Sequence, residues 1–94
     1  MATLHIEHPI TDYATWKRAF DGFAEMRTKS GVTAQRLHQP ADDDKYIVLQ
    51  LDFPSVEQAG AFKGFLETKV WTSPERSPAL AGVPRARVLV DATV

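Results

Sequence analysis

The stretch Leu4–Phe23, LHIEHPITDYATWKRAFDGF, decides the fold of this chain. Apolar and polar residues alternate up to Pro9, which is typical of a β-strand with one buried face. Proline cannot donate to a sheet, so Pro9 ends the strand. Thr11 or Asp12 can then cap a helix. Aromatic residues follow at three- and four-residue spacing, which predicts an amphipathic helix directly after the strand.

The same order of strand and helix recurs in the second half. Strand patterns lie at residues 3–8, 32–38, 46–53 and 85–93. A first helix of about five turns ends at Gly31, a second begins after Ser55, and residues 67–84 read as a loop. The order βαββαβ with right-handed crossovers predicts one ferredoxin-like α+β domain over residues 1–94. We expect an antiparallel sheet of order 4-1-3-2 with both helices on one face.

Length and composition describe one small domain. The 94 residues contain no cysteine, 44% apolar and 24% charged residues, and the formal net charge is −1. The lack of cysteine excludes disulfides and thiol catalysis. The charge argues against nucleic acid or a membrane surface as a partner, and no apolar run approaches the ~18 residues of a membrane span. The first residues lack the pattern of a secretory signal, so the cytoplasm is the expected compartment.

One face of the predicted sheet has no helix to cover it. With Leu4 and Ile6 facing the helices, His5 and Glu7 lie on this open face. A chain of this length buries only roughly 60–65% of its unfolded surface and is marginally stable alone. We therefore expect a homodimer through the open face, with a partly hydrated face of a monomer as the alternative. The same parity adds a mixed set from the later strands: Tyr46, Val48, Gln50, Asp52, Arg87, Leu89 and Asp91.

The pattern D-Y-x-x-W-K-x-x-F at residues 12–20, the element order, the length and the mixed sheet face together resemble a known group of proteins. The group is the dimeric α+β barrel superfamily, in particular its antibiotic-biosynthesis-monooxygenase-like branch. The resemblance covers the whole chain and implies homodimers whose sheets face each other. It also implies a pocket between sheet and helices for a small, often aromatic or polyketide-like molecule. Members include cofactor-independent quinol oxygenases, haem-degrading enzymes, polyketide cyclases, isomerases and ligand-sensing domains.

The predicted topology brings several reactive and aromatic side chains to one end of the sheet. The first two strands end there and the last two begin there, as does the first helix. The loop after the second helix can fold over the same end. The residues expected there are His8, Tyr13, Trp16, His38, Tyr46, Trp71 and Arg85.

We interpret these residues as a candidate catalytic and binding site. Histidine is the natural acid or base near neutral pH, so His38 or His8 is the candidate base for a phenolic substrate. Arg85 is positioned in sequence to hold the resulting anion. Aromatic walls suit a flat apolar substrate, and the aromatic residues assigned to them are Tyr13, Trp16, Tyr46 and Trp71.

A structural interpretation stays open for each of these residues. Trp16 and Phe20 at helical spacing are core residues first. His8 at a strand end fits a hydrogen-bonded structural histidine, and His38 beside a polar turn fits an exposed one. Trp71 fits a lid over the site and ordinary loop packing equally well.

No metal or cofactor site is predicted. His5 and His8 point to opposite faces of one strand, and the aspartates at 42–44 lack the spacing of a calcium loop. The sequence has no phosphate-binding glycine loop and no nicotinamide or flavin fingerprint. It also contains no asparagine, the residue associated with quinol oxygenation and haem degradation in the superfamily, so the resemblance implies neither reaction directly.

Three functions remain open at this stage. The first is a cofactor-independent oxygenase or cyclase-like tailoring enzyme, and the second is a non-catalytic ligand-binding or assembly module. The third is a structural dimer whose cleft is filled by Trp16 and Trp71. An apolar cavity between sheet and helices at the His8 end separates the first two functions from the third.

Overall fold

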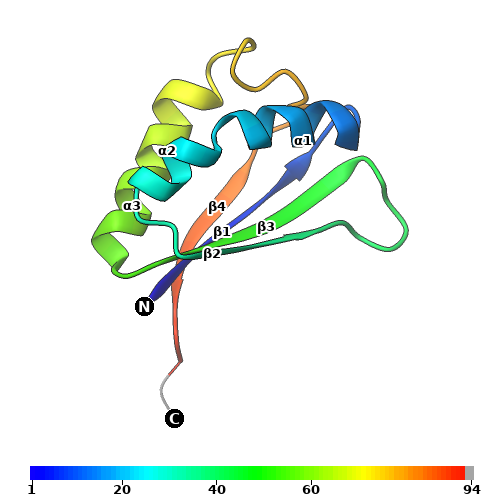
Figure 1. Cartoon of the computed structure of the whole chain (residues 1–94). Helices are drawn as coiled ribbons and strands as arrows, with labels where there is room; N and C mark the ends of the chain where they lie inside the picture. The colour runs from blue at the N-terminus through cyan, green and yellow to red at the C-terminus, as the bar shows by residue number, and fades with distance from the viewer. Residues whose placement is uncertain (93–94) are drawn as a thin grey trace.

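The computed structural model describes residues 1–92 and forms two layers, an antiparallel sheet with helices on one of its faces (Figure 1). The strands are β1 (Ala2–Pro9), β2 (Ala34–His38), β3 (Tyr46–Phe53) and β4 (Arg85–Val90). The helices are α1 (Tyr13–Gly22), α2 (Ala24–Lys29) and α3 (Val56–Phe65), and a π-helical turn (Leu66–Val70) continues α3.

The sheet has the strand order β2-β3-β1-β4, and every neighbouring pair is antiparallel. In the centre, β1 pairs with β3 from Ala2 opposite Phe53 to Pro9 opposite Tyr46. These findings confirm the predicted order 4-1-3-2 and the ferredoxin-like fold. They also place β2 at an edge of the sheet, as the sequence indicated.

Side-chain caps start both long helices. A carboxylate oxygen of Asp12 accepts a hydrogen bond from the Thr15 backbone N–H at 2.8 Å, which settles the choice between Thr11 and Asp12. Ser55 Oγ accepts from the Gln58 backbone N–H at 3.2 Å. Each cap satisfies a backbone donor that lacks a partner within its helix.

The first helix is not the single helix that the sequence predicted, because it breaks at Phe23. The backbone of Phe23 adopts φ −101° and ψ 12°. Gly22 precedes it, and glycine inside a helix costs about 1 kcal/mol relative to alanine. The guanidinium of Arg27 donates to the carbonyl oxygen of Phe20 across the break. The predicted stop is confirmed, since Gly31 reverses the chain with φ +102°.

The second helix is longer than predicted. The Trp71 backbone N–H bonds the Leu66 carbonyl at 2.8 Å, the i+5 pairing of a π-helical turn, so the loop begins only at Trp71. The last strand is shorter. Of its predicted range, Thr93 lies outside the described residues, and β4 ends at Val90 opposite Ala2. Asp91 lies one residue beyond β4, yet it lines a hollow of the open face together with Thr3, Gln50 and Leu89, so its predicted place on this face is confirmed.

Alternate residues of each strand serve two different faces. In β1 and β3 the core-facing set is nearly all apolar and fully buried: Ala2, Leu4, Ile6, Ile47, Leu49, Leu51 and Phe53. The predicted parity of His5, Glu7, Tyr46, Val48 and Gln50 on the open face is confirmed by the register.

The register also resolves the edge strand, whose parity the sequence left ambiguous. Arg36 lies opposite Gln50 and His38 opposite Val48, so both belong to the open face. Leu37, opposite Leu49, faces the helices.

Candidate functional site

A cavity of about 80 Å³ lies between the sheet and the helices. Its walls are mostly apolar side chains of β1, β3, α1 and α3, with polar groups at a few points. An engineered apolar cavity of about 150 Å³ binds benzene, so the cavity as it stands accepts no more than one small ring. The lining includes Ile6, His8, Trp16, Phe20, Phe23, Arg27, Phe62, Phe65, Trp71, Arg76 and Ser77.

His8 supplies a basic group to this cavity. It is the last core-facing residue of β1 and is only 4% exposed. Its Nδ1 lies 2.9 Å from the Pro9 carbonyl oxygen, and a carbonyl can only accept, so Nδ1 carries the proton. Burial lowers the pKa of His8 below its ordinary value, partly opposed by the bond to Pro9. The neutral ring therefore leaves Nε2 as an unprotonated acceptor, the form required of a general base.

The Trp71 loop closes the cavity at the His8 end. The indole of Trp71 meets the imidazole edge-on, with ring centroids 6.4 Å apart. The loop is tied down on both sides of that contact. Ser77 Oγ donates to the Val70 carbonyl at 2.9 Å, and the Ala81 backbone N–H donates to the Pro9 carbonyl at 3.2 Å. A ligand larger than one ring therefore requires this loop to move outward.

The aromatic stripe of α1 forms the opposite wall. Trp16 is buried and stacks on Phe20 with centroids 4.9 Å apart. Tyr13 packs against Trp16 from outside, is 37% exposed, and does not belong to the lining. Trp16 thus serves both the core and the cavity, while Tyr13 covers its outer edge.

Arg27 brings a positive charge into the lining. It is 6% exposed, its Nε donates to Gln35 Oε1 at 3.1 Å, and its guanidinium carbon lies 3.5 Å from the centroid of the Phe20 ring. Burial lowers the pKa of Arg27, and the negative charge of Asp21 partly opposes that shift. The lowered pKa means that burial destabilises the charged form of Arg27, so burying this charge costs folding free energy.

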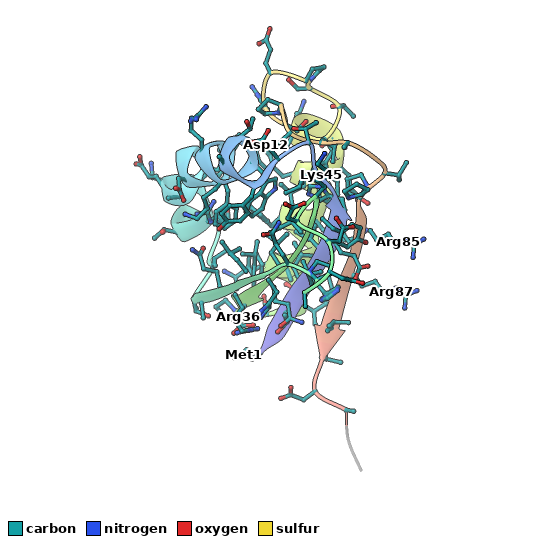
Figure 2. All side chains as sticks on the ribbon, turned by 90° about the vertical axis from the view of Figure 1, so that its right-hand side faces the viewer. Met1, Asp12, Arg36, Lys45, Arg85 and Arg87 are labelled. Atoms are coloured by element: carbon teal, nitrogen blue, oxygen red, sulfur yellow. The ribbon has the colours of Figure 1, made fainter. Side chains whose placement is uncertain are left out.

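Three predicted site residues lie on the other side of the sheet. His38, Tyr46 and Arg85 sit on the open face, since they pair with Val48, Pro9 and Glu7. Figure 2 shows Arg85 extending outward from β4. The structure therefore brings His8, Trp16 and Trp71 together and separates them by the sheet from His38, Tyr46 and Arg85.

The open-face groups bond one another instead. Tyr46 Oη donates to Glu7 Oε1 at 2.8 Å, and His5 Nε2 donates to Glu7 Oε2 at 2.9 Å. These two bonds, the one from His5 first, hold the pKa of Glu7 below its ordinary value, and the Glu7 partner raises the pKa of Tyr46. The separation has a simple reason: connectivity predicts which end of a sheet a residue reaches, whereas the face depends on register.

Sequence reasoning missed Arg27 and the loop residues Arg76 and Ser77 as lining residues. A signal for Arg27 was present, because it continues the helical spacing of Trp16, Phe20 and Phe23 although it is charged. A charge on an apolar helix face needs a specific partner. The loop residues carried no such periodic signal.

The described part of the chain has neither a metal-binding cluster nor a membrane-spanning helix. No cluster of three or more histidine, cysteine or carboxylate side chains suited to a metal ion occurs in residues 1–92. Over the same residues, no helix combines the length and the apolar character that a membrane crossing requires.

Several solved structures have the same fold as this chain. SnoaB from Streptomyces nogalater, described as a cofactor-independent oxygenase, matches with a TM-score of 0.70 and 14% identity over 99% of this chain and 94% of SnoaB. The chain has the antibiotic-biosynthesis-monooxygenase-like fold. A Nitrosomonas europaea protein described as a candidate antibiotic biosynthesis monooxygenase matches with a TM-score of 0.68 and 17% identity, over 99% of this chain and 100% of that one.

The antibiotic-biosynthesis-monooxygenase-like fold also occurs in proteins with other descriptions. An uncharacterised NIPSNAP domain protein from Burkholderia xenovorans matches with a TM-score of 0.61 and 17% identity, over 98% of this chain and 95% of that one. No protein-family model and no curated protein matches the sequence. At these identities the comparisons establish the fold, and arguments about activity depend on the residues of the cavity.

Proposed function

We propose that the chain binds a small aromatic or polyketide-like molecule in the His8 cavity and acts on it as a cofactor-independent oxygenase or cyclase-like tailoring enzyme. The observation that carries this proposal is that His8 lines an apolar cavity and that its Nε2 has no hydrogen-bond partner among the described residues. The described oxygenase activity of SnoaB, which has the same fold, supports the class of reaction.

In the proposed reaction, His8 Nε2 removes a proton from a phenolic or activated methylene group of the substrate. Trp16 and Trp71 hold the ring and exclude water, so the developing anion is paired with the imidazolium in a medium of low dielectric constant. Dioxygen is the oxidant in an oxygenation. A methylene carbon loses two hydrogens and gains one oxygen as a carbonyl, and the second oxygen leaves as water. In a cyclisation the same carbanion attacks a carbonyl of the same molecule.

The experiment uses acidic ring compounds of increasing size, namely hydroquinone, 1,4-dihydroxynaphthalene and anthrone. Oxygen uptake and mass spectrometry of the products report turnover above the uncatalysed rate. Removing a general base typically costs 10²–10⁴-fold, so His8→Gln should reduce turnover by about 100-fold while tryptophan fluorescence still reports binding. The same change at His38 tests the second candidate base. Equal turnover by His8→Gln and the parent protein contradicts the assignment of His8.

A non-catalytic ligand-binding or assembly module is the second candidate function. The small volume of the cavity and the absence of asparagine from the sequence favour it. It predicts saturable quenching of Trp16 and Trp71 fluorescence by the same compounds. It also predicts that prolonged incubation in air yields no product beyond the protein-free control.

We also propose that two copies pair through the open face. Val48 and the 40% exposed Leu89 place apolar side chains there beside a polar network, and a domain of this size gains stability from association. Light scattering coupled to size exclusion should give twice the chain mass, and Leu89→Glu should give the monomer mass. A monomeric parent protein at micromolar concentration contradicts the proposal.

A further inference from the structure

The charge of Arg27 is not balanced inside the cavity. Within residues 1–92 it has no carboxylate in salt-bridge distance. The negative charge of Asp21 partly opposes the lowering of the Arg27 pKa, but that side chain already pairs with Lys17 at 2.6 Å on the exposed face of α1. A buried guanidinium normally has an anionic partner, because the interior stabilises a lone charge poorly.

The hydrogen bonds of Arg27 leave donors unused. Nε bonds Gln35 and Nη1 bonds the Phe20 carbonyl, but no described residue accepts from Nη2. Every fully buried side-chain nitrogen or oxygen in the described chain has a partner, so Nη2 retains some accessible surface. The guanidinium can therefore bond an incoming acceptor without giving up its two existing bonds.

The lining contains no negative charge. Its one other charged residue is Arg76, an exposed side chain on the loop that closes the cavity, which donates to the Lys69 carbonyl at 3.2 Å, and no aspartate or glutamate belongs to the lining. The electrostatic potential of such a cavity favours an anion over a neutral molecule of the same shape.

We infer that the cavity is selective for a small apolar ligand with an anionic oxygen group, a carboxylate or a phenolate, and that Arg27 is the counter-ion for this group. The inference rests on the proposed function in one respect, namely that the cavity holds a small aromatic molecule. It adds the charge of the ligand and the residue that recognises it.

Arg27 and His8 lie toward opposite ends of the cavity. Gln35, the partner of Arg27, pairs with Leu51, whereas His8 pairs with Ile47. Four residues of a strand span about 13 Å. Gln35 and His8 thus lie beside strand positions that are about 13 Å apart. Arg27 is a binding residue that holds the anionic group, and His8 lines another part of the same cavity.

The test compares two probes of one shape that differ in charge, benzoate and benzamide. Quenching of tryptophan fluorescence measures both dissociation constants at pH 7. Charge-assisted bonds to a guanidinium exceed those to a neutral group by about 1–2 kcal/mol, so the parent protein should bind benzoate at least tenfold more tightly than benzamide. Equal affinities, or no saturable binding of either probe, overturn the inference.

Three variants separate recognition from a structural role. Arg27→Met keeps an unbranched apolar stem but removes the charge, and it should abolish the preference for benzoate. Arg27→Lys keeps the charge but cannot reproduce the two-point contact with Gln35 and Phe20, and it should retain part of the preference. Arg18→Met removes an exposed arginine from α1 and should leave both constants unchanged.

Circular dichroism and thermal unfolding confirm which variants remain folded. If Arg27→Lys loses the preference as completely as Arg27→Met while both remain folded, Arg27 only supports the break after α1 and the inference fails. Turnover is measured separately. A benzoate preference without any product contradicts the enzymatic proposal and supports the anion site. Turnover without a charge preference supports the enzymatic proposal and contradicts the anion site.

Discussion

The two faces of the sheet are built from alternate residues of the same strands, yet they satisfy their polar groups in different ways. On the open face, Glu7 accepts from His5 and Tyr46, and Asp52 accepts from Arg36 and Thr3. Both of these carboxylates therefore accept hydrogen bonds from other side chains.

On the covered face, His8 bonds a backbone carbonyl, and Arg27 bonds a backbone carbonyl and the Gln35 amide oxygen; these neutral acceptors cannot neutralise a charge. The two carboxylates Glu7 and Asp52 of the open face thus have side-chain partners, whereas the covered face keeps an acceptor on His8 and a donor on Arg27 without a partner among the described residues. The covered face, although it is the more apolar of the two, is therefore the face that can bind a polar group of a ligand. The following predictions test that comparison.

A matched pair of leucines tests how deeply each face is buried. Leu4 is fully buried on the covered face and Leu89 is 40% exposed on the open face. Leu4→Ala should lower the free energy of unfolding by about 2–5 kcal/mol, and Leu89→Ala by less than about 1 kcal/mol in the monomer. Urea denaturation at two protein concentrations measures both. An equal loss for the two variants in dilute solution would remove the distinction between the faces.

Asp52 tests the ionic network of the open face. The bonds from Arg36, and next from Thr3, lower the pKa of its carboxyl from 3.8 to about 2. A lowered carboxyl pKa stabilises the folded state fully above the unfolded pKa, and this stabilisation is lost as the pH falls from about 4 to about 2. Asp52→Asn should cost about 2 kcal/mol at pH 7 and should flatten the stability profile in that acid range. Asp42→Asn, in the exposed turn, is the matched control and should do neither.

On the covered face, the titration of His8 should change the stability of the protein at about pH 6, a higher pH range than that of Asp52. Burial lowers its pKa below 6.5, so below that pH the unfolded state takes up a proton more readily than the folded state does. Stability should be constant above about pH 6.5 and should fall below it by up to about 1.4 kcal/mol per pH unit. His8→Gln should lack this decline and His38→Gln should keep it. A decline that survives in His8→Gln would assign the titration to another group.

Tyr46 tests a single bond of the open face. Tyr46→Phe removes the hydrogen bond to Glu7 and should cost about 1 kcal/mol. The pKa of Glu7 should rise toward its ordinary value, because one of the two bonds that lower it is lost. Nuclear magnetic resonance titration of the Glu7 carboxyl measures this shift. An unchanged Glu7 pKa would mean that the His5 bond alone determines it.

Much of the fold was predictable because it depends on local chemistry. Alternation in β1 and β3, the caps at Asp12 and Ser55, and the glycine stop at Gly31 all act within a few residues of the chain. The break at Phe23 was not predictable from periodicity, because the apolar spacing continues through it. It is accompanied by a bond from Arg27 to a carbonyl one helical segment earlier.

The sequence by itself determined the order of the elements, the strand order of the sheet, and the end of the sheet at which the candidate site residues arrive. Only the tertiary structure decided which face each of them occupies, since a shift of one residue in register exchanges the faces. The register assigned His8 to a cavity with Trp16, Trp71 and Arg27, and it assigned His38, Tyr46 and Arg85 to the opposite side. Pairing between distant strands sets that register, and no short stretch of sequence contains it.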